Sequence, residues 1–345
     1  MLKKLSLIIL TTIISILSFN SCEKGTEPEE LKPGRRDYTW SVDTVQIFGT
    51  YLMKMWGSSP TDVWAVGSGS DYDKEIWHYD GKEWKTDGVW RGIHPWCIYG
   101  FAKDDIWIAG SDGEIWHYDG NDWSESLSYH KELNFKYERI YFMDIWGDSP
   151  NNVYAVGLAD SSDTSMGDVR FGIMMHYNGT KWSRVSIEFT EGIFMDIRKG
   201  RNTSDEYFMR NVIQFPDSTR FHTFDGKNID EIYHEIGAIQ SLTIIDDEIL
   251  FGFNKGAYTY ANSAFRLAVK NPFPNSWDAI YGRNKRDIIW TMSDGLTHYN
   301  GTDFEYILEF DGSSLSDGAI FKNEVFFLSA DFNNGTNVIY HGILK

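Results

Sequence analysis

The chain has few basic residues relative to its acidic ones. Its 32 Lys and Arg stand against 50 Asp and Glu, which gives a formal net charge of -18. Such a charge disfavours nucleic acid, whose phosphates the protein would repel, and it disfavours lying flat on anionic lipid. We therefore expect a soluble, solvated surface and no nucleic-acid partner.

Proline and the common catalytic motifs are also scarce. The chain has only 8 Pro, whereas aromatic residues make up 16% and include 14 Trp, a composition typical of a folded, strand-rich protein. We find no sialidase-type Asp box, no phosphate-binding loop, no Gly-x-Ser-x-Gly and no HExxH motif. These absences argue against the commoner catalytic sites but do not exclude a lyase or hydrolase, which needs only a few residues at a channel. We predict no catalytic residue, no metal and no cofactor.

The longest apolar run lies near the N-terminus and is too short to span a membrane. Two lysines precede LSLIILTTIISIL, and a small residue, Ser21, then precedes Cys22, whereas a spanning helix needs about 20 apolar residues. This is the layout of a targeting segment, and SFNSC resembles the boxes of bacterial lipoprotein signal peptides, especially of the Bacteroidetes type. The resemblance implies that residues 1–21 are removed and that Cys22 is lipidated, carrying palmitate. An ordinary secretory peptide is the alternative.

The residues after Cys22 have no apolar pattern. EKGTEPEELKPGRRD is polar and contains Pro and Gly, so we expect residues 22–37 to form a flexible tether. Its acidic cluster resembles the surface-export signals of lipoproteins in the same bacterial group. If Cys22 is acylated, Cys97 has no disulfide partner, and its apolar context, HPWCIYG, predicts a buried structural thiol. We expect the outer membrane or the cell surface, with membrane contact through the lipid anchor only.

One phrase recurs along the rest of the chain. WGSSPTDVWAVG (56–67) returns as WGDSPNNVYAVG (146–157), and IWHYDGKEW (76–84) returns as IWHYDGNDW (115–123), MMHYNGTKW (174–182) and LTHYNGTDF (296–304). FHTFDGKNI (221–229) and YTYANSAF (258–265) are decayed copies. The spacing suits one four-stranded propeller blade. In each unit Asp-Gly or Asn-Gly forms a hairpin turn, since both residues tolerate positive φ.

The last unit lacks its outer strand, and the N-terminus supplies matching text. YTWSV (38–42) resembles KWSRV (181–185), so we expect the N-terminal strand to complete the last blade and close the ring, which removes exposed sheet edges. The prediction is an all-β propeller over residues 38–345, with seven blades, or six if the two decayed units merge. The repeats resemble bacterial kelch-like and two-component-regulator-propeller units; such propellers in secreted lipoproteins usually act as sensory or binding platforms.

The variable text falls on one face of this predicted ring. The stereotyped turns within a blade share one face, whereas the long inserts 86–96, 124–142, 157–172 and 210–220 share the other. Insertions confined to one face usually mark a binding face. Since residues 38–42 start at the stereotyped face, the variable face should point away from the membrane. We predict that Trp90, Trp96, Tyr129, Tyr137 and Tyr141 contact the ligand there; packing under long loops is the alternative.

The remaining polar candidates have simpler interpretations. His78, His117, His176 and His298 occupy one repeat position and are too far apart to share an ion, so we expect structural hydrogen bonds. Asp80, Asp119 and Asp225 should be turn residues, and Asp62, Asp105 and Asp287 should cap loop backbones. His94, His130, Glu132 and Glu138 could serve as acid and base, but we interpret them as solvated charges on loops. Asp160, Asp163 and Asp168 lack EF-hand spacing for calcium.

The sequence therefore predicts a lipid-anchored binding or scaffold module of the cell envelope. Its expected partner is a glycan or another envelope protein, and we expect a monomer. The alternative is a secreted polysaccharide-active lyase or hydrolase with its site at the channel mouth. An acid and a base about 5–10 Å apart in a deep pocket would favour the enzyme, whereas a mouth lined by Met, Phe and Trp would favour binding.

Overall fold

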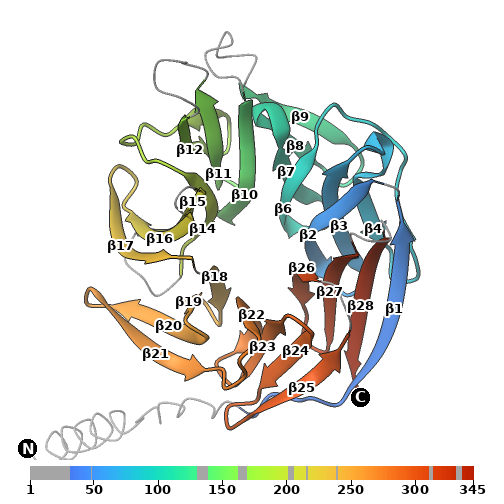
Figure 1. Ribbon diagram of the computed structural model, residues 1–345. Helices are drawn as coiled ribbons and strands as arrows, with labels where there is room; N and C mark the ends of the chain where they lie inside the picture. The colour runs from blue at the N-terminus through green and yellow to red at the C-terminus, as the bar shows by residue number, and fades with distance from the viewer. Residues whose placement is uncertain are drawn as a thin grey trace, which may run out of the picture. The chain divides into compact units, whose positions relative to one another are not determined.

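A ring of seven sheets makes up the folded unit (Figure 1). The computed structural model describes residues 32–345, except 48, 130–138, 162–168, 201–205, 215–216, 238–239, 311–313 and 332–335. The compact unit runs from Pro33 to Lys345, and each sheet has four antiparallel strands. The predicted seven-bladed all-β propeller is confirmed. The six-bladed alternative is wrong, because the two decayed repeats form separate sheets.

The blades follow one another along the chain. Blade one has β2 (Thr50–Ser59), β3 (Asp62–Gly69), β4 (Ile76–Tyr79) and β5 (Trp84–Lys85). Blade two has β6 (Pro95–Ala102), β7 (Asp105–Gly110), β8 (Glu114–Tyr118) and β9 (Trp123–Ser128). Blade three has β10 (Arg139–Ser149), β11 (Asn152–Ser161), β12 (Val169–Tyr177) and β13 (Trp182–Arg184). Blade four has β14 (Ile193–Arg198), β15 (Tyr207–Gln214), β16 (Asp217–Phe224) and β17 (Ile229–Ile236).

The second half of the ring repeats the pattern. Blade five has β18 (Ser241–Ile245), β19 (Glu248–Phe253), β20 (Gly256–Ala261) and β21 (Ala264–Lys270). Blade six has β22 (Ser276–Asn284), β23 (Asp287–Met292), β24 (Gly295–Tyr299) and β25 (Phe304–Glu309). Blade seven has β26 (Ser314–Ile320), β27 (Glu324–Asp331), β28 (Thr336–Leu344) and β1 (Tyr38–Gln46). Short 3-10 turns, η1 (Tyr72–Lys74) and η2 (Ser111–Gly113), follow β3 and β7. No helix of the described residues is long and apolar enough to cross a membrane.

The N-terminal strand closes the ring, as the sequence predicted. β1 pairs with β28 from Tyr38↔Leu344 to Gln46↔Thr336, and the blue and red strands lie side by side in Figure 1. The residues just before β1 also dock on blade six. Gly34 donates its backbone N–H to the carbonyl of Arg286 (2.8 Å), and Arg36 donates to the carbonyl of His298 (2.9 Å). The last residues of the predicted tether therefore belong to the folded unit, whose boundary lies at Pro33.

The apolar core lies between neighbouring blades. At the closing seam, fully buried Leu52 and Val63 of blade one pack with Phe326 and Ile339 of blade seven. Equivalent clusters fill the other seams. A single blade has no partner for its own faces, so burial of apolar surface, the main stabilising term in folding, is available only in the ring.

The strand order separates two faces. The connections β2–β3 and β4–β5, with their equivalents, lie on one face, here called the turn face. The connections β3–β4 and those between blades lie on the other, the loop face. Tyr38 pairs with the end of β28, so the described chain reaches β1 from the turn face. The predicted separation between chain attachment and variable loops is confirmed for these residues.

The repeated hairpin turns differ from the expectation in detail. Tyr79 pairs with Trp84, so the turn holds four residues, and only Gly81 has positive φ (88°). Asp80 instead accepts the backbone N–H groups of Lys82 (3.0 Å) and Glu83 (3.1 Å). Asp119 and Asp225 do the same in their own turns, which confirms them as turn residues. The turn of blade five has two residues, Asn262 and Ser263, both with positive φ.

Candidate functional site

The repeated histidines form structural hydrogen bonds, as predicted. The Nε2 atom of His78 lies 2.7 Å from Asp62 Oδ1, and the ring of His78 stacks on Trp64 with centroids 4.2 Å apart. The same bond joins His117 to Asp105, His176 to Asn152 and His298 to Asp287, at 2.7–2.8 Å. The histidine side chains therefore stabilise the individual blades through these hydrogen bonds. Among the described residues no group of His, Cys, Asp and Glu could hold a metal ion.

The turn acids do not cap loop backbones, contrary to expectation. Asp62 accepts the indole N–H of Trp64 (3.1 Å) as well as the bond with His78, and Asp105 binds Trp107 and His117 alike. Burial acts to raise the pKa of Asp62, but the hydrogen bonds from His78 and Ser58 outweigh it and lower this pKa. The turn acid therefore ties strands two and three of a blade together through side chains.

A ring of charged residues lines the channel, and sequence reasoning missed it. It follows the register shift in the innermost strands, where Lys54, Asp144, Asp196 and Asp317 occur. Asp144 accepts the backbone N–H of Ile197 in the next blade, and Asp317 that of Met55, both at 3.0 Å. The recurring strand text MKMW, MDIW and MDIR is the signal that could have revealed it.

The charges of this ring are paired with each other. Arg198 forms an ion pair with Asp144, and Arg210 forms one with Asp196. The three channel carboxylates, Asp317 foremost, raise the pKa of Lys54 and keep it cationic. The ring therefore joins the blades electrostatically across the channel instead of presenting an unpaired acid or base.

A cavity opens above the ring at the loop-face mouth of the channel. Its volume is ≈ 530 Å³. The loop-face ends of the inner, second and third strands of blades three and four provide most of its wall, with Trp96 of blade two and Gln240 beside blade five. The lining includes the apolar or aromatic residues Trp96, Tyr141, Met143, Leu158, Ile193, Met195 and Val212 and the polar residues Arg139, Asp160, Arg170, Arg210, Gln214, Asp217, Thr219 and Gln240. The methionines and the aromatic pair match the lining that the sequence analysis associated with binding.

The charge at the mouth differs from that of the whole chain. Asp160 is 4% exposed and is held by Arg139 (2.6 Å) and Arg170 (3.4 Å). With Arg210 and Asp217 added, the lining has three arginines and two carboxylates. Since Arg210 is paired with Asp196, the charges at the mouth are balanced, in contrast to the acidic chain as a whole.

The predicted ligand residues fall into different places. Trp96 and Tyr141 line the mouth together, with ring centroids 5.6 Å apart. Trp90 lies apart from them, 44% exposed, beside Tyr72. Tyr129 is only 6% exposed and packs in the core between blades two and three, so burial removes it from the candidate set. Tyr137 and Cys22 lie outside the described residues.

The other polar candidates also lie in different environments. His94 is not solvated loop charge, because its Nδ1 lies 2.7 Å from Oε1 of Glu75, which is 2% exposed. Burial raises the pKa of this glutamate. Asp160 is committed to two arginines rather than to a cation. His130, Glu132, Glu138, Asp163 and Asp168 lie outside the described residues.

Residues that sequence reasoning missed at the mouth come from strand alternation. The missed residues are Met143, two positions after the predicted Tyr141 in β10, and Ile193 and Met195, two positions apart in β14, so each pair shares one side of its strand. This alternation could be predicted from the sequence, in IYFM and GIFM. The sequence did not predict which side of the strand faces the channel, because that depends on how the blades are arranged.

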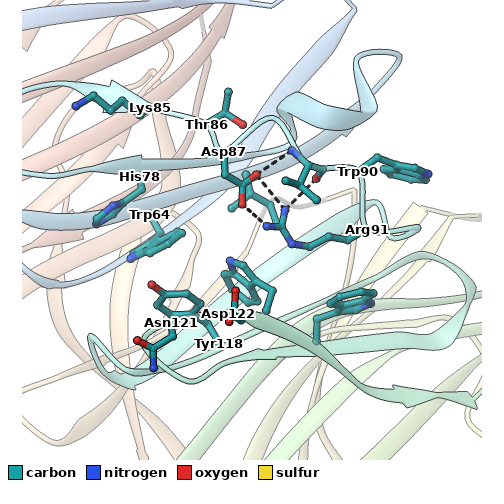
Figure 2. A pocket seen from close by; sticks show the side chains of 14 residues that line it. Trp64, His78, Lys85, Thr86, Asp87, Trp90, Arg91, Tyr118, Asn121 and Asp122 are labelled. Carbon is teal, nitrogen blue, oxygen red and sulfur yellow. Dashed lines mark hydrogen bonds and ion pairs between the residues drawn. The ribbon is translucent and has the colours of Figure 1, made fainter.

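A second, larger cavity of ≈ 750 Å³ lies in the seam between blades one and two (Figure 2). Its lining comprises Trp64, Ile76, His78, Lys85, Thr86, Asp87, Val89, Trp90, Arg91, Trp116, Tyr118, Asn121, Asp122 and Trp123. We call it the inter-blade groove. It is distinct from the channel mouth, with which it shares no lining residue.

Comparisons with known proteins give information on the fold of the chain. No family model and no curated protein matches the chain. Solved structures do: YCF48 bound to D1 peptide has a TM-score of 0.62 at 13% identity, covering 90% of this chain and 99% of that one. An extracellular domain described as part of a hybrid two component system of B. thetaiotaomicron has a TM-score of 0.54 at 11% identity, covering 87% of this chain and 39% of that one.

The similar structures differ widely in function. The GH74 enzyme of Niastella koreensis has a TM-score of 0.51 at 11% identity, covering 85% of this chain and 43% of that one. At such identities a likeness is evidence of fold and carries no function. The chain is a seven-bladed β-propeller, a fold that can serve as a binding or scaffold module.

Proposed function

We propose that the protein is a lipid-anchored binding module of the bacterial cell envelope, and that the channel mouth on its loop face engages a segment of another envelope protein. The observation that carries this proposal is the mouth cavity itself. It combines flexible Met143 and Met195 with the aromatic pair Trp96 and Tyr141. Methionines adapt to irregular apolar partners, and aromatic residues supply much of the binding energy at interfaces.

The charge and position of the cavity support a protein partner. Arg139 and Arg170 flank the single buried carboxylate of Asp160, and arginine recognises carboxylates with paired hydrogen bonds. The cavity lies on the face opposite the one from which the chain reaches β1. A lipid on Cys22 would therefore leave the mouth pointing away from the membrane. YCF48, a propeller of similar fold, is described as bound to a peptide.

The enzymatic alternative has weaker support at this cavity. Asp160 pairs with two arginines, and Asp196 pairs with Arg210. A carboxylate held in an ion pair is a poor proton donor. A glycan remains the other candidate ligand for the mouth, and the GH74 likeness keeps polysaccharides among the ligands to test.

Affinity capture with matched variants tests the proposal. The Cys22→Ser protein, which cannot be acylated, is used as bait on envelope extracts, and bound proteins are compared with those of a Trp96→Ala/Tyr141→Ala variant. Trp182→Ala, at the rim of a different seam, is the control. We expect one envelope protein to be retained by the parent and the control and lost with the double variant. Equal capture by all three baits, or hydrolysis of offered polysaccharides, contradicts the proposal.

The anchor is tested separately. Cells expressing the chain are labelled with radioactive palmitate, and the label should appear in the wild type and be absent from Cys22→Ser. Label that persists in the variant, or is absent from both, refutes the assignment of Cys22.

A further inference from the structure

The inter-blade groove exists because the outer strand of blade one ends early. β5 pairs with β4 at only two positions, whereas β9, its equivalent in blade two, continues to Ser128. The two strands follow nearly the same turn, IWHYDGKEW against IWHYDGNDW, and then diverge as KTDGVW and SESLSY. Leu127 of β9 pairs with Ile115 and is 6% exposed, but Gly88 stands at the matching position of blade one. Gly88 has φ of 69° and no side chain, so the chain turns away and the outer part of the seam, beyond its buried apolar cluster, stays open.

The segment that leaves the sheet is held by its own hydrogen bonds. Arg91 forms a two-pronged ion pair with Asp87, with Nη1 3.2 Å from Oδ1, and also donates to the carbonyl of Val89 (2.9 Å). Asp87 Oδ1 accepts the backbone N–H of Val89 (3.0 Å). Figure 2 shows this network above the groove, with Trp90 at its edge. A loop fixed before binding loses less entropy when a ligand arrives.

Aromatic rings dominate the apolar part of the groove. Trp116, Tyr118 and Trp123 of blade two face Trp64 of blade one across the seam, and the rings of Trp64 and Trp123 lie 5.8 Å apart. Trp90 extends this aromatic surface, since it is 44% exposed and lies 4.9 Å from Tyr72, which is 50% exposed. Aliphatic side chains are few, Ile76 and Val89. Ring faces without aliphatic pockets suit flat, weakly apolar surfaces better than branched peptide side chains.

The polar part of the groove is balanced in charge. The cationic residues Lys85 and Arg91 are balanced by Asp87 and Asp122, and Asn121 adds a neutral hydrogen-bonding group. In a chain with a net charge of -18, a lining with zero net charge and both donors and acceptors favours a neutral, hydroxyl-rich ligand over an ion. The volume of ≈ 750 Å³ falls within the range of about 300–1,000 Å³ typical of small-ligand sites.

The seam between blades two and three is the closed counterpart of the inter-blade groove. Between blades two and three, Trp182 holds the place that Trp123 has in the groove, and its indole N–H donates to Ser126 (3.1 Å). For Trp123 no such partner occurs within the described part of the chain. Asp87 stands at the position equivalent to Ser126, and its carboxylate is turned to Arg91. The indole N–H of Trp123 is therefore available to donate a hydrogen bond to a hydroxyl group of a ligand.

From this geometry we infer that the inter-blade groove is a second binding site, separate from the channel mouth, and that it takes a neutral oligosaccharide. Sugar rings stack on Trp123, Trp116 and the Trp90–Tyr72 pair through their C–H faces, while Asn121, Asp122 and the Trp123 indole meet their hydroxyls. The protein would thus bind a glycan at the side of the ring and its protein partner at the mouth.

Calorimetric titration of the Cys22→Ser protein tests the inference. The probes are cellopentaose, maltopentaose, mannopentaose and laminaripentaose, with pentagalacturonic acid as the charged comparison. We expect at least one neutral probe to bind, and Trp123→Ala and Trp90→Ala each to weaken it by about tenfold or more, as truncation of an aromatic anchor does. Trp182→Ala, the matched residue of the closed seam, should leave the affinity unchanged.

The outcomes separate this inference from the proposed function. Trp90 is on an exposed loop, so its variant reports on binding even if Trp123→Ala perturbs folding, and thermal unfolding checks each variant. No binding of any neutral probe, binding of the acidic probe alone, or equal losses with Trp182→Ala overturns the groove site. A Trp96→Ala/Tyr141→Ala protein should keep full affinity for the sugar. If it loses that affinity, the sugar binds at the mouth and the groove assignment is wrong.

Discussion

Replacing His298 by Ala should destabilise the protein far more than the same change at His78, although the two residues share one repeat position. His298 is fully buried, with Nε2 2.8 Å from Asp287 and Nδ1 accepting from Arg36 Nε at 3.2 Å. Hydrogen bonds to a charged group are worth about 1.5–3 kcal/mol, and the space left by the ring adds about 1–2 kcal/mol. We expect a loss of about 3–5 kcal/mol in the free energy of unfolding.

The side chain of His78 is 34% exposed, so water can replace much of what it provides. Asp62 also keeps its bonds to Trp64 and Ser58 after the change. Exposed ion pairs and hydrogen bonds contribute about 1 kcal/mol or less, so we expect a correspondingly small loss.

Urea unfolding followed by tryptophan fluorescence measures both variants, and the shift in midpoint multiplied by the slope gives each loss. The expected difference is about 2–4 kcal/mol. Equal shifts for the two variants would refute the reasoning, since they would mean that burial does not set the strength of the repeated His–Asp bond.

Three further predictions concern single residues. Cys97 is 1% exposed and burial raises the pKa of its thiol well above the ordinary value, so it should resist iodoacetamide in the native state and react after unfolding; native labelling would contradict the buried placement. Burial lowers the pKa of His222 to about 4, below the unfolded value near 6.5, so the unfolded chain binds more protons between these values and stability falls as pH drops through that window. At pH 5 the wild type should lose about 2 kcal/mol more than His222→Phe relative to pH 8, and parallel pH profiles would exclude this role. Asp317→Ala should cost about 3 kcal/mol in urea unfolding, because it removes bonds to Met55 N and the hydroxyl of Tyr281 in neighbouring blades; a loss below about 1 kcal/mol would show that the channel ring does not hold the blades.

Much of the fold was readable because it depends on local repetition. The HYDG and HYNG turns mark one strand pair in each unit, and β-strand periodicity fixes what each unit buries. The closing role of residues 38–42 followed from counting strands, since a blade of three strands leaves an edge unpaired. The same repetition identified the histidines as structural, because one residue per blade cannot converge on one ion.

The candidate sites depended on contacts that no local pattern encodes. Trp90 and Tyr129 occupy equivalent positions in blades one and two, six residues after the Trp that follows the hairpin turn. Trp90 is nevertheless exposed, whereas Tyr129 is 6% exposed in the core. Gly88 in place of Leu127 decides the difference, by leaving nothing to bury against the sheet. Trp96 and Tyr141 belong to different blades and meet only because those blades are neighbours at the channel.

The sequence by itself determined the blade, its turns and the strand that closes the ring, and it favoured seven repeats over six, because these follow from short-range periodicity and from the need for a fourth, outer strand in every blade. Only the tertiary structure decided where ligands can bind. The mouth and the groove are spaces between blades, and such spaces depend on which side chains of distant segments fill the seam and which leave it open.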